Sequence, residues 1–304
     1  MKARIDGLRI FYRSVGAEDH YPIVVLHGGG GLDHTYLRPW FDPLSERFRV
    51  LFVDLRGHGR SERVDPATVS LPVLAADVSK LAGVLGLKRY AVLGHSFGAF
   101  VALTHAIEDG TASHYVLAHG SASLTKTAEE ITANISAFEP TALRDQLTQG
   151  WALETTATTA AEIAEAWRLQ LPMHFARPDS PAYHAFVGPD GGLARTLWAP
   201  GMASVSVTLE YEEALGQVRR PTLIVTGEYD RVCTPRASRE MHIGIRGSDL
   251  TILAGVGHMG MAERPDLYLE AIRRFFERHP LGASSRCRCC PGRNLYPTTA
   301  HLYD

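Results

Sequence analysis

Ser96 lies in the sequence Gly94-His-Ser-Phe-Gly98, a G-x-S-x-G pattern that can present a serine hydroxyl to a substrate. An apolar run, residues 90–93, precedes the pattern, and a second apolar segment, residues 99–107, follows it. This motif needs a strand, a sharp turn and a helix, because the flanking glycines let the backbone turn tightly around the serine. The context therefore predicts a nucleophilic Ser96. The alternative is an ordinary serine in a glycine-rich turn.

A serine hydroxyl attacks efficiently only when a base removes its proton and a third group orients that base. Asp230 follows the apolar run 222–225, and His258 follows the apolar run 250–253. Parallel strands end at one edge of a sheet, so both side chains are expected beside Ser96, in the chain order Ser, Asp, His. We predict His258 as the base and Asp230 as its orienting group, with Glu228 as the close competitor of Asp230. The alternatives are a turn-forming aspartate and a buried structural histidine.

The attack would create an oxyanion, which requires preorganised N–H donors. The glycine-rich sequence His27-Gly-Gly-Gly-Gly31 directly follows the apolar run 23–26, and its backbone can approach a substrate closely. We predict that the backbone N–H groups of Gly29 and Phe97 form this oxyanion hole, with Gly30 as the second choice for the loop donor. His27 is expected to hold the loop. A phosphate-binding loop is excluded, because the pattern G-x-x-x-x-G-K-[ST] is absent.

The elements that must position these residues are short buried strands alternating with helices. Residues 4–14 alternate around Asp6-Gly7, which favours a hairpin of two antiparallel strands. A start signal at Ser70 and a stripe of leucine and valine up to Leu85 predict one helix, and residues 265–279 predict the last one. This alternation predicts a doubly wound α/β fold with a mostly parallel eight-stranded sheet. Its parallel strands are expected at residues 23–26, 50–53, 90–93, 115–117, 222–225 and 250–253.

Residues 121–206 break the alternation, since only helical patterns such as 160–171 occur there. A connection this long is expected to be a helical cap over the sheet's edge, inserted between core segments 1–120 and 207–280. The tail, residues 281–304, has no periodicity and is expected to be poorly ordered. It carries Cys287, Cys289 and Cys290, but no second Cys/His pair at zinc-finger spacing accompanies them, so no metal site is predicted.

The charge balance argues against several kinds of partner. The 304 residues contain 31 Lys and Arg and 33 Asp and Glu, for a formal net charge of −2, and nucleic-acid binding normally requires a basic surface. The first ten residues lack the apolar core of a signal peptide, and no run resembles a membrane span. Four cysteines, three of them bunched near the end, do not form a disulfide framework. We therefore expect a cytoplasmic protein with neither nucleic-acid nor membrane partners.

Together these segments resemble the α/β-hydrolase superfamily, in the branch similar to proline iminopeptidases and related small esterases. The resemblance runs from about residue 4 to residue 279, apart from the predicted cap. It implies the α/β-hydrolase fold, and a serine at the nucleophile position speaks against dehalogenases and epoxide hydrolases, which carry aspartate there. The segments that carry it are His27-Gly-Gly-Gly-Gly-Leu-Asp-His34, Asp54-Leu-Arg-Gly-His-Gly-Arg-Ser61, Gly94-His-Ser-Phe-Gly98, Gly227-Glu-Tyr-Asp230 and Gly255-Val-Gly-His258. Within the second segment, Asp54, Arg56 and His58 are interpreted as residues that shape a loop.

The chain departs from the iminopeptidase pattern at Gly30, which replaces a proline, and at His95 and Phe97, which replace glycine and tryptophan around the serine. An aminopeptidase must also bind a free ammonium group, and a desolvated ammonium needs a paired charge. Five predicted cap residues could supply a carboxylate, although exposed helix carboxylates are the commoner explanation for each. They are Glu129, Glu130, Glu154, Glu162 and Glu165.

The predicted function is a serine hydrolase that cleaves a small carboxylic ester, or an amide, through an acyl-enzyme. No metal or organic cofactor is required, because the chain itself supplies the nucleophile, the base and the N–H donors. Two other activities remain open, a proline-iminopeptidase-like aminopeptidase and a hydrolase of carbon–carbon bonds. A different class also remains open, a ligand sensor on a hydrolase scaffold, since one fold serves many functions. The sequence makes no prediction of oligomeric state.

Overall fold

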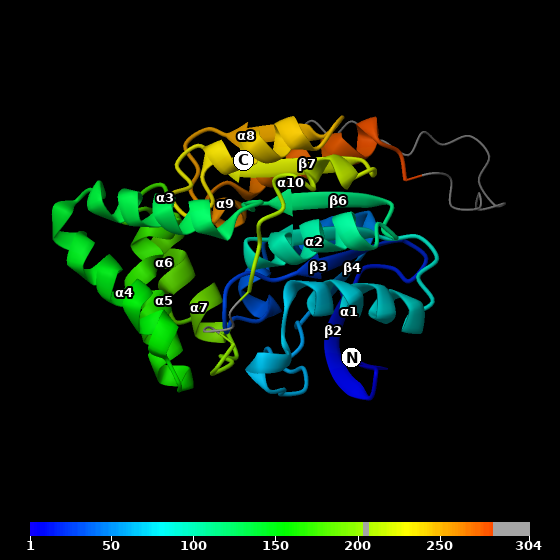
Figure 1. Cartoon of the computed structure of the whole chain (residues 1–304), viewed down its shortest axis with the longest axis horizontal. Helices are drawn as coiled ribbons and strands as arrows, with labels where there is room; N and C mark the ends of the chain where they lie inside the picture. The colour runs from blue at the N-terminus through cyan, green and yellow to red at the C-terminus, as the bar shows by residue number, and fades with distance from the viewer. Residues whose placement is uncertain (203–206, 282–304) are drawn as a thin grey trace, which may run out of the picture.

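The computed structural model describes residues 1–202 and 207–281. An eight-stranded sheet in the order β1-β2-β4-β3-β5-β6-β7-β8 runs through its centre (Figure 1). Strand β2 pairs antiparallel with both β1 and β4, and the strands from β4 to β8 pair in parallel. The predicted fold class is confirmed. The strands are β1 Lys2–Ile5, β2 Leu8–Val15, β3 Tyr21–Leu26, β4 Phe48–Val53, β5 Ala91–His95, β6 His114–Ala118, β7 Thr222–Gly227 and β8 Asp249–Leu253.

Helices cover both faces of the sheet, which explains why its central strands are apolar throughout. In β3, Val24 and Leu26 belong to one hydrophobic core, and Ile23 and Val25 belong to the other. The alternation follows from the two-residue period of a strand. The first core includes side chains of α1 (Leu71–Val84), α2 (Phe97–Glu108) and α8 (Pro235–Gly244), and the second includes side chains of α9 (Gly260–Glu263) and α10 (Pro265–Arg278).

Local signals define the ends of several elements. The β1–β2 turn has positive φ at Asp6 and at Gly7, as a tight hairpin turn between two strands requires. Helix α1 begins after Ser70, whose side chain accepts a hydrogen bond from the backbone N–H of Val73. Helix α10 ends at Arg278, one residue before the predicted end, because His279 leaves the helical conformation ahead of Pro280.

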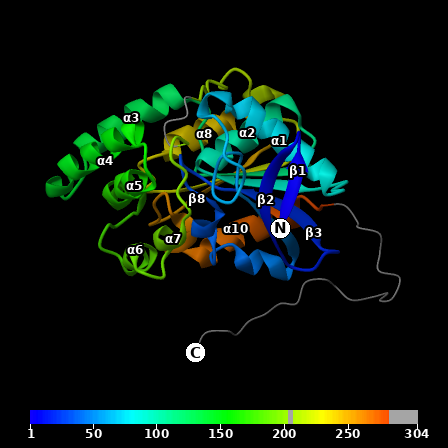
Figure 2. The ribbon, with the colours of Figure 1, turned by 90° about the horizontal axis from the view of Figure 1, so that it is seen from below.

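The described residues between β6 and β7 form five α-helices, which lie together at one side of the molecule in both views (Figures 1 and 2). We refer to them as the cap helices: α3 (Leu124–Ser136), α4 (Arg144–Thr156), α5 (Ala160–His174), α6 (Pro181–Val187) and α7 (Gly192–Arg195). Helix α5 extends beyond the predicted helical pattern, because it continues through Pro172 to His174. Residues 203–206 of the predicted cap lie outside the described residues. So does the predicted tail after Leu281, with Cys287, Cys289 and Cys290.

Within residues 1–202 and 207–281, each helix is too short or too polar to span a bilayer.

Candidate active site

Ser96 occupies the turn between β5 and α2, with backbone angles φ 56° and ψ −119°. Glycine is needed on both sides of this turn: a Cβ on Gly94 would lie 2.0 Å from the carbonyl oxygen of Gly98, and a Cβ on Gly98 would lie 2.3 Å from that of Leu26. Positive φ is strained for a serine and persists only where the surrounding structure enforces it. The close packing of this turn against β3 provides that enforcement and leaves Ser96 partly exposed at the strand's end.

His258 and Asp230 meet at the same edge of the sheet. The Nδ1 atom of His258 lies 3.0 Å from Oδ1 and 2.9 Å from Oδ2 of Asp230. The carboxylate also accepts backbone N–H groups from Val232 and Cys233, each at 2.9 Å. Since Nδ1–H is donated to Asp230, neutral His258 has its lone pair on Nε2, the atom that a base must offer to a serine hydroxyl. Glu228 instead accepts a hydrogen bond from the backbone N–H of Gly255.

The surroundings of Asp230 keep it ionised. Burial alone would raise the pKa of this carboxyl, but the neighbouring His258, together with hydrogen bonds from His119 and His258, holds the pKa well below its usual range. The carboxylate can therefore orient His258 and stabilise an imidazolium across the neutral pH range.

The side chain of His95 ties the His258 loop to the turn that carries Ser96, and Tyr36 in turn bonds His95. The Nε2–H of His95 donates to the backbone carbonyl of His258 at 3.1 Å, and its Nδ1 accepts from the hydroxyl of Tyr36 at 2.8 Å. Burial lowers the pKa of His95 well below its ordinary value, so the ring is neutral, as this bonding pattern requires. The residue before Ser96 thus fixes the backbone of the predicted base.

The glycine-rich loop after β3 is held by His27. Its Nδ1–H donates to the carbonyl of Gly28 at 2.9 Å, and its Nε2 accepts the backbone N–H of Leu55 at 3.1 Å. The N–H of Gly28 donates to Tyr36 at 2.7 Å and is therefore already used. Because the Gly28 carbonyl and the Gly29 N–H belong to one peptide plane, fixing the carbonyl also fixes the direction of that N–H. Since its N–H is already used, Gly28 is excluded as the loop donor, and Gly29, with Gly30 as the second choice, stays the predicted donor. Phe97 is the first residue of α2, where the backbone N–H has no partner within the helix.

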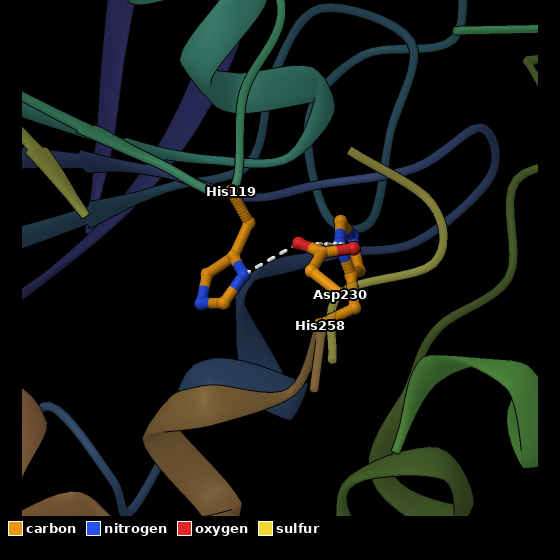
Figure 3. A group of neighbouring side chains, drawn as sticks. All are labelled: His119, Asp230 and His258. Atoms are coloured by element: carbon orange, nitrogen blue, oxygen red, sulfur yellow. Dashed lines mark hydrogen bonds and ion pairs between the residues drawn. The ribbon is translucent and has the colours of Figure 1, made fainter. Parts of the chain in front are cut away.

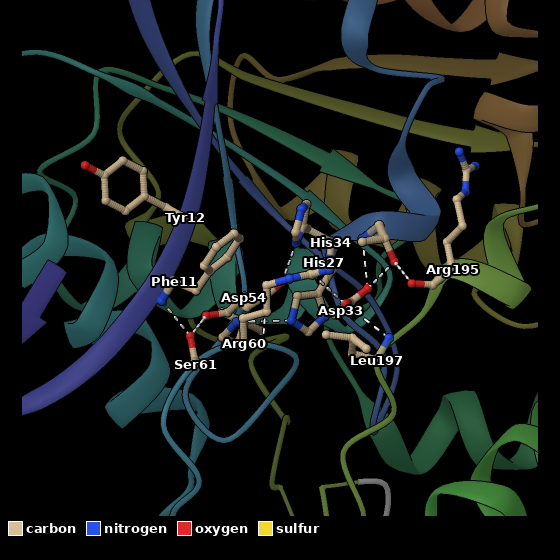
Figure 4. A network of polar contacts seen from close by, with 12 residues as sticks. Phe11, Tyr12, His27, Asp33, His34, Asp54, Arg60, Ser61, Arg195 and Leu197 are labelled. Atoms are coloured by element: carbon tan, nitrogen blue, oxygen red, sulfur yellow. Dashed lines mark hydrogen bonds and ion pairs between the residues drawn. The ribbon is translucent and has the colours of Figure 1, made fainter. Parts of the chain in front are cut away.

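A network of polar contacts anchors this loop to the segment after β4 (Figure 4). Asp54 accepts hydrogen bonds from the backbone N–H groups of His34 at 3.1 Å and Arg60 at 2.8 Å, and its carbonyl accepts from Ser61 at 2.6 Å. Arg60 also pairs with Asp33 at 3.3 Å. The network therefore holds the segment after β3, through Asp33 and His34, against the segment after β4 that contains Asp54 and Arg60.

Arg56 and His58 take part in the same loop. Arg56 makes two hydrogen bonds to Asp77 on α1, at 2.7 and 2.6 Å, and the carbonyl of Arg56 accepts from Nδ1 of His58 at 2.9 Å. These contacts agree with the interpretation of both residues as loop-shaping.

Tyr36 offers a stability test of the link between the glycine loop and His95. Replacing Tyr36 by phenylalanine leaves the buried N–H of Gly28 without its acceptor, so we expect the free energy of unfolding to fall by about 1–3 kcal/mol. Urea denaturation measures this loss. The control is Tyr21→Phe, since Tyr21 is half-buried and its hydroxyl bonds the side chain of Ser113 rather than a buried backbone group; it should change stability by less than about 0.5 kcal/mol. Equal effects of the two substitutions would contradict the assigned link.

The cap helices contact the site through α5. The indole N–H of Trp167 donates to the carbonyl of Gly30 at 3.3 Å, and the ring of His174 lies edge-on to that of His258, with centroids 5.3 Å apart. Burial, and then the neighbouring His258, lowers the pKa of His174 to about 3, so this ring is neutral. Helix α5 therefore covers both the glycine loop and the predicted base.

The segment that follows α5 is fastened next to both predicted catalytic loops. Glu263 accepts the backbone N–H of Gly257 at 2.7 Å and that of Ala176 at 2.9 Å. Arg231, the residue after Asp230, donates to the carbonyl of Phe175 at 2.9 Å. These bonds join the end of α5 to the loops of Asp230 and His258.

Three residues in this arrangement were not predicted from the sequence: Tyr36, His119 and His174. His119 directly follows β6, and its Nδ1 lies 2.7 Å from Oδ2 of Asp230 (Figure 3). The position of His119 after an apolar run, as for Asp230 and His258, is a signal that could have identified it. Tyr36 and His174 reach the site through loop and helix packing, for which the sequence offers no comparable pattern.

Two buried groups bring three metal-binding side chains to within 4.8 Å of one another, His119 with Asp230 and His258, and Asp33 with His34 and Asp54. In each group, a histidine Nδ1 already forms a hydrogen bond to a carboxylate of the same group. The carboxylates therefore have partners without a cation.

The comparisons with known proteins agree with the fold. The family model described as Alpha/beta hydrolase family matches residues 23–271, and the chain belongs to this family. A proline iminopeptidase, PfmaB, of Pestalotiopsis fici is 27% identical over 286 residues, which cover 90% of this chain and 98% of that protein.

Two solved structures illustrate the breadth of the fold. The proline iminopeptidase of Mycobacterium smegmatis superposes with a TM-score of 0.69 at 19% identity, covering 92% of this chain and 98% of the other. The enol-lactonase of Burkholderia xenovorans superposes with a TM-score of 0.67 at 22% identity, covering 91% of this chain and 100% of the other. At these identities the likeness concerns the fold alone.

Proposed function

We propose that this α/β hydrolase is a serine hydrolase that cleaves a small carboxylic ester, or an amide, through an acyl-enzyme. The observation that supports the proposal is the buried hydrogen bond from His258 Nδ1 to Asp230, 2.9 Å long. The backbone carbonyl of His258 is bonded by His95, the residue before Ser96 in the strained turn. A strained serine between two close-packed glycines, a histidine oriented by its Nδ1–H and an ionised aspartate are the groups that nucleophilic catalysis by serine uses.

In the proposed reaction, Ser96 Oγ attacks the substrate carbonyl while Nε2 of His258 takes the serine proton. The oxyanion of the tetrahedral intermediate accepts hydrogen bonds from the N–H groups of Gly29 and Phe97. His258 then gives its proton to the leaving alcohol or amine. A water molecule, deprotonated by His258, attacks the acyl-enzyme, and the acid is released as Ser96 regains its proton.

A substrate panel tests the proposal. The panel contains p-nitrophenyl esters of increasing acyl length, proline p-nitroanilide and a dienone substrate for carbon–carbon cleavage, compared by kcat/KM. We expect the highest kcat/KM on a short-chain ester. Preference for the anilide would instead support an aminopeptidase, and preference for the dienone a carbon–carbon hydrolase. Tight binding of a ligand with negligible turnover on the whole panel would favour the sensor.

One residue favours an aminopeptidase as the second candidate, in keeping with the name of the Pestalotiopsis relative. Glu154 is one of the five glutamates predicted as candidates, and burial raises its pKa to about 7. Its Oε2 accepts a hydrogen bond from Gln170 at 2.8 Å, and the carbonyl of Gln170 accepts from Nδ1 of His174 at 3.1 Å. His174 lies against His258, so Glu154 is connected to the wall of the site.

The other four glutamates have structural explanations. Glu130 pairs with Arg236, Glu162 completes the capping box at the start of α5, and Glu165 pairs with Arg168. Glu129 is exposed on α3.

The aminopeptidase candidate predicts a pH-dependent KM. Because the pKa of Glu154 is about 7, its carboxylate forms as the pH rises toward neutrality, and only the ionised form pairs with a substrate ammonium. For proline p-nitroanilide, KM should therefore fall between about pH 6 and about pH 7.5, and Glu154→Gln should remove this dependence and raise KM about 10-fold to 100-fold.

Steady-state kinetics on a free and an N-acylated anilide measure the effect. Glu162→Gln is the matched control on a neighbouring cap helix and should leave KM for both substrates unchanged. A KM that is the same for the free and the N-acylated anilide, in the wild type and in Glu154→Gln, would rule out this role for Glu154.

A further inference from the structure

Asp230 has a second histidine partner in addition to His258. The Nδ1 of His119 lies 2.7 Å from Oδ2 of Asp230, a shorter contact than either contact of His258 (Figure 3). The side chains of His119 and Asp230 are fully buried. Since the carboxylate oxygen is the acceptor, the proton of this bond sits on Nδ1 of His119.

The bonds that Asp230 accepts show what His119 contributes. Oδ1 accepts the backbone N–H groups of Val232 and Cys233 in addition to contacting His258. Oδ2 contacts His258 and His119, with the hydroxyl of Thr226 at a long 3.4 Å. Two backbone N–H groups therefore fix Oδ1 of Asp230. Apart from His258, the short hydrogen bond that fixes Oδ2 comes from His119.

His119 is held rigidly in this position. Its ring stacks on that of Tyr268, with centroids 5.8 Å apart and planes 9° from parallel. Its φ angle is 52°, in the left-handed region, which histidine, asparagine and aspartate enter more readily than most residues. Its Nε2 is buried and forms no hydrogen bond with any residue that the structure describes. A second proton on the ring would lack a partner there, so His119 is favoured in its neutral form.

We propose that His119 is a positioning residue of the Ser96, Asp230 and His258 constellation, an inference that rests on the proposed function. Its Nδ1–H fixes the plane of the Asp230 carboxylate and draws part of the negative charge onto Oδ2. The carboxylate then faces His258 with part of its negative charge already compensated by His119. It therefore orients His258 without keeping the imidazole permanently protonated. The proton taken from Ser96 stays on His258, because His119 already has its Nδ1 proton in the bond to Asp230.

The other ionisable groups around this pair also define its charge. The ring of His95 lies 5.3 Å from that of His119 and 5.2 Å from that of His258, and His174 lies on the far side of His258. Burial lowers the pKa of both flanking histidines, and burial raises that of Tyr268, so all three are neutral near pH 7. Arg231 and Glu263 are the nearby groups that can carry charge.

Removing His119 should therefore have two consequences. The carboxylate of Asp230 loses its second anchor, so that His258 is less often aligned, and kcat falls. The charge that His119 had drawn away becomes available to His258, which stabilises the imidazolium and moves the acid limb of the kcat/KM profile to higher pH. A residue that only filled space would change the amount of folded protein without moving that limb.

The experiment compares His119→Ala with His119→Asn in the full-length chain, with p-nitrophenyl acetate as the substrate. Asparagine retains an N–H donor near the position of Nδ1 and tolerates the positive φ. We expect kcat to fall about 10-fold to 100-fold in His119→Ala, with KM within about twofold and the acid limb at higher pH. In His119→Asn, kcat should recover to within about threefold of the wild type. The matched control, His114→Asn at the opposite end of β6, should match the wild type.

An acid limb in His119→Ala that coincides with that of the wild type, or no recovery in His119→Asn, would overturn the proposal. A ring-nitrogen NMR spectrum of the ¹⁵N-histidine-labelled wild type tests it without any substrate or variant. Both His119 and His258 should be Nδ1–H tautomers with hydrogen-bonded protons, and an Nε2–H tautomer at His119 would also overturn it. If the proposed function itself were wrong, Ser96→Ala would retain the wild-type hydrolytic activity, which distinguishes that failure from failure of the His119 proposal.

Discussion

Replacing Ser96 by alanine should lower kcat by about 10⁴-fold to 10⁶-fold on the best substrate of the panel, because the acyl-enzyme can no longer form. The fold should remain intact. Alanine differs from serine at this turn only by the hydroxyl, and the glycines that enclose the turn are unchanged. Steady-state kinetics measure the loss in activity, and circular dichroism with thermal unfolding verifies the fold.

Ser79 on α1 provides a matched control for Ser96. Its hydroxyl lies 2.8 Å from Nε2 of His105 and also hydrogen-bonds Asp109, so Ser79 is a serine whose neighbours, a histidine and an aspartate, are of the types proposed to activate Ser96. Ser79 is placed inside a helix, away from a glycine loop that could bind an oxyanion. Ser79→Ala should therefore keep wild-type kcat. Near-normal activity in Ser96→Ala, or a large loss in Ser79→Ala, would remove Ser96 as the nucleophile.

Replacing His258 by alanine should cost about as much as replacing Ser96, because neither group promotes the reaction without the other. The double variant Ser96→Ala/His258→Ala should then be no slower than either single variant. Removal of the orienting group in Asp230→Asn should lower kcat by about 10⁴-fold, since the amide no longer stabilises the imidazolium or selects the Nδ1–H tautomer.

Single-turnover and steady-state rates of the wild type, the two single variants Ser96→Ala and His258→Ala, and their double variant measure the interaction energy between Ser96 and His258. If the losses of the single variants multiplied in the double variant, Ser96 and His258 would act independently. That result would contradict a proton transfer between them.

Much of the fold could be predicted from the sequence, because its signals are local. The apolar runs of β3 and β7 are buried on both faces, and their short length and flanking proline and glycine predict strands rather than buried helices. Asp6 and Gly7 define the hairpin through their own backbone preferences. The positions of Ser96, Asp230 and His258 also follow from local order, since each lies in the segment that follows a parallel strand of the sheet.

The contacts that complete the site depend on long-range packing instead. Tyr36 meets Gly28 and His95 through the path of a loop, which no spacing in the sequence encodes. His174 reaches His258 because α5 continues through Pro172, a residue that normally interrupts a helix. His119 follows β6 as the predicted site residues follow their strands, but a single histidine gives no sign of which carboxylate it will meet.

Covalent labelling with a fluorophosphonate tests the proposed nucleophile most directly, because the reagent reacts with an activated serine whatever the natural substrate is. Mass spectrometry of the digested adduct should identify one modified peptide, containing Ser96. The adduct should be absent in Ser96→Ala, strongly slowed in His258→Ala and unchanged in Ser79→Ala. An adduct on another serine, or equal labelling of the wild type and Ser96→Ala, would contradict the account.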